Sequence, residues 1–122
     1  MDKNIIQAGR LNIAVVHSDT PFICDAQLAL DFMMSVCYND TCTHIAINKE
    51  AFTDDFFVLS TGVAGEILQK AVNYGMKIAI TGDFSVYKSR ALRDFIYECN
   101  NGNDIFFVKN REEAVSKLEA CR

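Results

Sequence analysis

Short apolar runs alternate with amphipathic helical patterns along the whole chain. Two runs come first and are joined at Ala8-Gly9-Arg10, and each later run is followed by a segment whose apolar residues recur every three or four positions. A short apolar run is typical of a buried strand, and the three-to-four spacing is typical of a helix. Strands that alternate with helices pair in parallel through right-handed crossovers. The pattern therefore predicts an α/β fold.

The predicted order of elements is β-β-α-β-α-β-α-β-α. Glycine between the first two runs is typical of a hairpin, so we expect the first strand to lie antiparallel at one edge of the sheet. We expect a mixed, mostly parallel five-stranded sheet with about four helices on its faces. Asp25, Ser85 and Asn110 are the predicted capping residues of three of these helices. The 122 residues suit a single α/β domain spanning residues 1–122.

Charge and composition narrow the range of partners. The net charge of −4 argues against nucleic acid, because a phosphate backbone requires a basic surface. No apolar run approaches the length of a membrane span, and the first ten residues lack the apolar core of a secretory signal, so we expect a cytoplasmic protein that binds no membrane. The five cysteines show no C-x-x-C spacing, which argues against a disulfide framework or a zinc site. We expect neither a metal nor a cofactor.

A Ser60-Thr61-Gly62 step opens one predicted helix, from about Gly62 to Tyr74, and Gly65 follows one turn later. A helix start has unpaired N–H groups and partial positive charge, so it can bind phosphate. Two glycines on one face also expose the backbone there, at a cost in helix stability. The alternative is that the glycines allow close packing of helix on sheet, with Ser60 or Thr61 as an ordinary cap.

A second candidate site follows the apolar run that ends at Thr81. Gly82, Asp83 and Ser85 come directly after this predicted strand, where α/β sheets usually bind ligands. Cationic side chains follow in the first half of the next predicted helix: Lys88, Arg90 and Arg93. They could bind an anion, or Arg90 could pair with Asp94 one turn later while the others are solvated.

The two candidate sites should lie at the same edge of the sheet. If the strands that precede them are neighbours, the two helix starts would face one shallow crevice with Glu66, Asp83 and Ser85 near it. Asp83 and Glu66 are then candidates for a catalytic acid and base, although no nucleophile–base pair accompanies them. His17, at the end of the second predicted strand, could also act as a base.

The chain resembles a bacterial family, Domain of Unknown Function 4180. The pieces that carry the resemblance are Phe56-Phe57, Thr61-Gly62, the run from Ala64 to Lys70, Asn73-Tyr74, the run from Gly82 to Ser85, and the run from Arg93 to Ile96. The resemblance covers essentially the whole chain and implies no activity.

More loosely, the order of elements is similar to that of STAS domains. In the STAS antagonists of anti-sigma factors, a phosphorylatable hydroxyl residue directly precedes a glycine that opens a helix, as Thr61 precedes Gly62. Those proteins carry an acidic residue where this chain has Leu59.

Three functional hypotheses follow. In the first, the protein is a regulatory or interaction module, not an enzyme, that binds a partner protein or a small anion near Thr61 and is switched by phosphorylation of Thr61 or Ser60. In the second, it is a small enzyme for a phosphorylated or carboxylated metabolite, which uses Asp83 or Glu66 together with the three cations named above. In the third, it is a scaffold that forms a homodimer.

Overall fold

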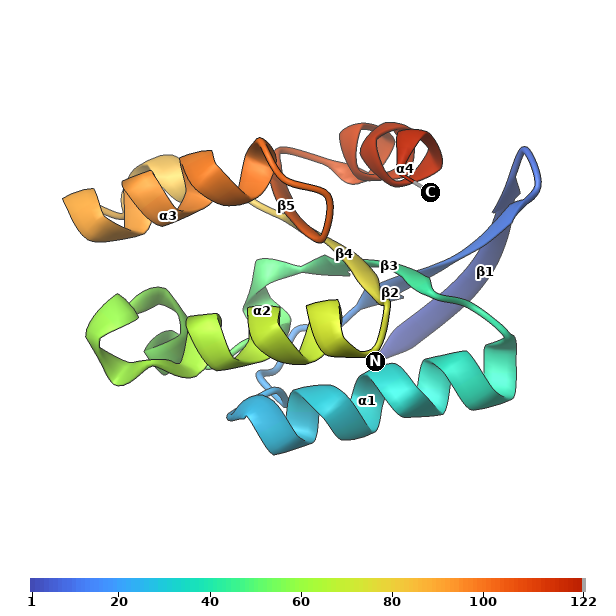
Figure 1. The fold of residues 1–122 in the computed structure, drawn as a ribbon, viewed down its shortest axis with the longest axis horizontal. Coiled ribbons are helices and arrows are strands. Elements are labelled where there is room, and N and C mark those ends of the chain that lie inside the picture. Colours follow the sequence, from blue (N-terminus) through green and yellow to red (C-terminus); the bar gives the residue numbers. More distant parts are fainter. Residues whose placement is uncertain (122) are drawn as a thin grey trace.

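A computed structural model describes residues 1–121, which form one five-stranded mixed sheet (Figure 1). The strands are β1 (Asp2–Ala8), β2 (Leu11–His17), β3 (His44–Asn48), β4 (Lys77–Thr81) and β5 (Ile105–Val108). They lie side by side in the order β1-β2-β3-β4-β5. β1 pairs antiparallel with β2 at one edge, and all other pairs are parallel. The predicted sheet is confirmed.

Four α-helices connect or follow the strands: α1 (Ala26–Asp40), α2 (Val63–Asn73), α3 (Arg90–Asn100) and α4 (Arg111–Ala120). Four short 3-10 helices lie in the connections: η1 (Lys49–Ala51), η2 (Asp54–Phe57), η3 (Leu59–Thr61) and η4 (Phe84–Val86). The first three separate the end of β3 from the start of α2, and η4 separates β4 from α3. Each of these two helices therefore begins several residues after the strand that precedes it.

Capping side chains fix where three helices begin. Asp25 accepts a hydrogen bond from the main chain at the start of α1, and Asn110 does so at the start of α4, as predicted. The prediction for α3 is wrong, because Ser89 caps that helix by accepting from the Leu92 N–H at 3.2 Å. Ser85 instead lies in η4, where its main chain and hydroxyl both bond to Asp83.

The topology places three helices on one face of the sheet and one on the other. Right-handed crossovers between neighbouring parallel strands taken in order keep α1, α2 and α3 on the same face. Figure 1 shows α1 and α2 side by side, with α4 on the opposite side of the sheet. Phe107 belongs to the core under the three helices, and Phe106 belongs to the smaller core under α4. The two consecutive phenylalanines therefore point to opposite faces, as expected for a sheet covered on both sides.

All five cysteines are free thiols; Cys42, Cys99 and Cys121 are buried, and Cys24 is exposed. Within residues 1–121, none of the helices combines the length and the apolar character needed to cross a lipid bilayer.

Candidate functional site

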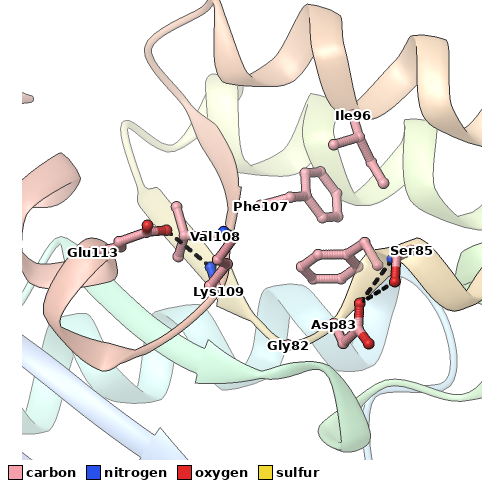
Figure 2. A pocket seen from close by; sticks show the side chains of 9 residues that line it. Gly82, Asp83, Ser85, Ile96, Phe107, Val108, Lys109 and Glu113 are labelled. Carbon is pink, nitrogen blue, oxygen red and sulfur yellow. Dashed lines mark hydrogen bonds between the residues drawn. The ribbon is translucent and has the colours of Figure 1, made fainter.

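A pocket of about 630 Å³ opens at the carboxyl ends of β4 and β5 (Figure 2). The helix before β5 and the helix after it lie on opposite faces of the sheet, so the chain segments that follow β4 and β5 diverge. A crevice at such a point is where open α/β sheets commonly bind ligands. The pocket is lined by Gly82, Asp83, Phe84, Ser85, Ile96, Phe107, Val108, Lys109 and Glu113.

The floor of the pocket is apolar. The rings of Phe84 and Phe107 meet edge to face, with their centroids 5.2 Å apart. Ile96, from α3, points toward Phe107 (Figure 2). Phe107 is 5% exposed, whereas Phe84 and Ile96 are half-buried. An aromatic and aliphatic floor of this kind suits an apolar group of a ligand or of a partner side chain.

Asp83 and Ser85 form a polar part of the rim. Asp83 Oδ1 accepts from the Ser85 hydroxyl at 2.6 Å and from the Ser85 main-chain N–H at 3.0 Å (Figure 2). These hydrogen bonds, the side-chain one first, hold the pKa of Asp83 below its ordinary value. Both residues are exposed, so the Asp83 carboxylate carries its charge at the mouth of the pocket.

Glu113 and Lys109 form another part of the rim. Asn110 caps α4, and Glu113, three residues later, accepts from the Lys109 main-chain N–H at 3.0 Å (Figure 2). This arrangement resembles a capping box, with the acidic side chain bonded one residue before the cap. It holds the Glu113 carboxylate beside the pocket. The charged side chains of the lining are therefore two carboxylates and one ammonium.

Lys49, which was not among the predicted site residues, lies against the loop that bears Asp83. Its Nζ donates to the Asp83 carbonyl at 3.2 Å and lies 4.9 Å from the centroid of the Tyr87 ring. Its side chain passes so close to Gly82 that a Cβ there would lie 2.7 Å from Lys49 Cδ. Its position in the sequence could have identified it, because Lys49 directly follows β3 just as Gly82 directly follows β4.

The Ser60–Gly65 segment lies outside this pocket. β3 and β4 are neighbours, as the expected crevice required, but none of the residues from Ser60 to Gly65 lines the pocket. The Thr61 hydroxyl lies 2.8 Å from the carbonyls of Asp55 and Val58, and it accepts weakly from the Val63 N–H at 3.3 Å. Thr61 therefore holds η2 and η3 together in addition to accepting at the helix start.

The two glycines of this segment are not packing sites. Apart from the adjoining chain and the helix's own backbone, no atom of residues 1–121 would lie within 4 Å of a Cβ added at Gly62 or Gly65. The expectation that they allow close packing of helix on sheet is therefore wrong. Gly62 has φ of 80°, a left-handed conformation that glycine adopts readily. Gly65 lies exposed inside α2 without such a requirement.

Aromatic contacts connect the Thr61 segment to the pocket. Phe57, at the end of η2, stacks on Tyr87 with centroids 4.8 Å apart and an interplanar angle of 14°. The same ring lies 6.4 Å from Phe84, which lines the pocket. The loop before α2 and the loop after β4 therefore touch through side chains of the core.

The remaining candidate residues do not converge on the pocket. Lys88 precedes α3, Arg90 is its first residue and Arg93 lies one turn on; all three are exposed and none lines the pocket. Within residues 1–121, no ion pair joins Arg90 to Asp94. Glu66 is exposed on the first turn of α2 and is not part of the lining, so the pocket does not bring it together with Asp83.

His17 is exposed, and its Nε2 lies 3.0 Å from Asp19 Oδ1. Among the residues that the structure describes, no three His, Cys, Asp or Glu side chains are grouped as a metal ion would require.

The chain belongs to the family described as "Domain of unknown function (DUF4180)", which matches residues 8–118 of the 122. The match covers β2 to β5 and α1 to α3 in full, includes only the last residue of β1, and stops just before the end of α4. No curated protein and no solved structure matches the chain significantly.

Proposed function

We propose that the protein is a binding module whose principal site is the pocket at the carboxyl ends of β4 and β5. The observation that carries the proposal is the combination of an apolar floor with carboxylates on the rim. Phe84, Ile96 and Phe107 offer apolar surface to a ligand. The carboxylates of Asp83 and Glu113, at the mouth, can accept hydrogen bonds from it. Such a site fits an apolar group that carries a cationic or N–H-donating end.

The charge of the rim favours a cation over an anion. Two carboxylates and the ammonium of Lys109 leave a net negative rim. The Asp83 charge is supported by its bonds from Ser85, and the ammonium of Lys49 is already engaged by the Asp83 carbonyl and the Tyr87 ring. An amine or a basic peptide side chain next to an aromatic or aliphatic group therefore matches the site better than a phosphate does.

Matched fragments test this preference. Phenethylamine and phenylacetate present the same ring with opposite charges, so each can be titrated into labelled protein while backbone amide resonances are followed by NMR. We expect phenethylamine to perturb the amides of residues 82–85 and 107–109 and to bind more tightly than phenylacetate. The proposal fails if neither fragment perturbs these amides, or if phenylacetate binds at least as tightly.

Variants show whether Asp83 sets the preference. Asp83→Asn should reduce the ratio of the two affinities by about two- to fivefold, the range expected for one exposed ion pair. Asp94→Asn removes another exposed carboxylate, from α3, that does not line the pocket, so it serves as the control. Equal effects of the two variants would mean that only the overall charge of the protein matters.

A second candidate function is regulation by phosphorylation of the Ser60–Thr61 step. Ser60 is exposed and, within residues 1–121, its hydroxyl makes no hydrogen bond, whereas the Thr61 hydroxyl lies within bonding distance of two carbonyls. Ser60 is therefore the more available acceptor. Phosphate there would add about two negative charges beside the start of α2. The contacts of Phe57 with Phe84 and Tyr87 offer a route from this loop to the pocket.

Mass spectrometry of the protein purified from its own host tests this second function. We expect a covalent phosphate that maps to Ser60. Thr61→Ala should lower stability because the hydroxyl holds η2 to η3, while Ser60→Ala should leave stability unchanged and remove the modification. A chain without phosphate under all growth conditions would refute the regulatory function and leave the pocket proposal untouched.

A further inference from the structure

A row of polar side chains crosses four strands on the face of the sheet that carries α4. Ala46 and Ala79 belong to the core beneath α4, and side chains two residues apart on a strand share a face. Asn48 and Thr81 therefore face the same side and are opposite each other in the register of β3 and β4. By the same alternation from Ile13, His17 also faces this side.

The register extends the row to the edge strand. Asp2 lies opposite His17 in the β1–β2 pair. Val16 pairs with Ile47, so the next residue on each strand places His17 beside Asn48. With neighbouring strands about 4.8 Å apart, the row from β1 to β4 is about 14 Å long.

α4 leaves this end of the face open. The turn of the β1–β2 hairpin comes close to the C-terminal part of α4, where a Cβ on Gly9 would lie 3.8 Å from Glu119 Oε1. At the other end, a pocket of about 300 Å³ remains between the strands and the first residue of α4, Arg111. Its polar lining consists of Asp2, Asn4, His17, Asn48, Thr81 and Arg111.

Several of these polar groups have no partner within residues 1–121. Arg111 forms no ion pair there, and the side chains of Thr81 and Asn4 make no hydrogen bond. Asn48 differs, because it is buried and bonded to both polar main-chain atoms of Ser18 and so forms a fixed part of the wall. The pocket therefore offers free donors on a rigid base.

We infer that this second pocket binds a small molecule with an oxyanion at one end and hydroxyl groups at the other. The guanidinium of Arg111 presents a planar set of donors that suits a carboxylate or a phosphate, and the Thr81 hydroxyl can add a donor. Asp2, on β1, accepts hydrogen bonds from the hydroxyl groups. The Asp2 carboxylate repels an anion that has no hydroxyl groups. Hydrogen bonds from the hydroxyl groups to Asp2 should therefore increase affinity as well as selectivity.

Titrations with three small probes test the inference. Glycerol 3-phosphate and glycerate each combine an oxyanion with hydroxyl groups, and inorganic phosphate carries the oxyanion alone. We expect at least one of the first two to perturb the amides of residues 2–4, 15–17, 46–48, 81 and 111, with higher affinity than inorganic phosphate. No perturbation of these amides by either hydroxylated probe at millimolar concentration would overturn the inference. Tighter binding of inorganic phosphate would also overturn it.

Single substitutions assign the two ends of the ligand. Arg111→Gln should weaken the hydroxylated probe by about tenfold or more, as expected for loss of a charge-assisted hydrogen bond. Arg93→Gln removes an exposed guanidinium on α3 that does not line this pocket and should have no effect. Asp2→Asn should reduce the preference for the hydroxylated probe over inorganic phosphate. Unchanged binding in Arg111→Gln would overturn the inference.

A third variant tests whether the effects on binding arise only from the overall charge of the protein. Thr81→Val keeps the shape of the side chain, removes the hydroxyl, and should weaken the same probe without changing the charge of the protein. Asp83→Asn, which belongs to the other pocket, should leave the binding of this probe unchanged. A clear change in the binding of this probe in Asp83→Asn, in either direction, would mean that the probe occupies the first pocket, which would refute the inference.

Discussion

Substitution of the two glycines at the start of α2 by alanine should change stability in opposite directions. Gly65 lies exposed within the helix, and an added Cβ would have open space around it, with no atom of another described segment within 4 Å. Alanine there reduces the conformational entropy of the unfolded chain, so Gly65→Ala should stabilise the protein by about 0.5–1 kcal/mol. Gly62 also has open space around it, but its φ of 80° is left-handed, so Gly62→Ala should cost about 1–2 kcal/mol.

Urea unfolding of the two variants and the unsubstituted protein measures the difference. The two alanine variants should differ by about 2 kcal/mol, which corresponds to about 1 M in the urea midpoint for a domain of this size. In thermal unfolding, Gly65→Ala should raise the midpoint by about 3 °C. Because the two substitutions are chemically identical and three residues apart, their opposite signs report the backbone conformation alone.

The reasoning would be refuted if Gly65→Ala destabilised the protein or if Gly62→Ala had no effect. If Gly65→Ala is more stable than the unsubstituted protein, as expected, then glycine at position 65 does not serve stability. The exposed backbone at the start of α2 then becomes the feature to test for partner binding, because functional sites commonly retain residues that lower stability.

Three further measurements examine other local features. Ser85→Ala should raise the pKa of Asp83 toward its ordinary value, and NMR titration of the carboxylate measures this change. The hydrogen bonds from Ser85 stabilise the folded state at pH values above the ordinary pKa of the carboxyl group. This stabilisation is lost as the pH falls through the lowered pKa of Asp83 in the folded protein. Burial and the nearby Glu98 carboxylate raise the pKa of Cys99 to about 11, so brief alkylation at pH 8 followed by mass spectrometry should find exposed Cys24 modified and Cys99 unmodified. Asn110→Ala removes the cap of α4 and should cost about 1 kcal/mol in thermal unfolding.

The sequence predicted most of the fold because its strands and helices have clearly different periods. The edge hairpin, the parallel strands and the caps at Asp25 and Asn110 all follow from local chemistry. Ser85 was the predicted cap of α3, but Ser89, a second serine four residues later, caps the helix. Only the bonds from Ser85 to Asp83, which form a 3-10 turn, decide between them.

The candidate site was predicted only in part. Gly82, Asp83 and Ser85 line the larger pocket, and their position directly after a buried strand was the signal that identified them. Lys109 and Glu113 were not found, because their proximity to Asp83 depends on which strand lies beside β4. The Ser60–Gly65 segment was expected in the same crevice, but the length of chain between β3 and α2 made its position unpredictable from strand order alone.

The sheet order also explains where the two pockets lie. Neighbouring parallel strands taken in sequence place all three crossover helices on one face, since each crossover is right-handed. Within residues 1–121, α4, which follows the last strand, is the one helix left to cover the other face. With ten residues it covers the core around Ala46 and Ala79 but not the polar ends of β1 to β4.

The larger pocket opens where the chain passes from one face to the other, and the polar pocket opens where α4 begins. Because Arg111 and Asp83 belong to different pockets, substitution of either one can report on its own pocket without altering the lining of the other.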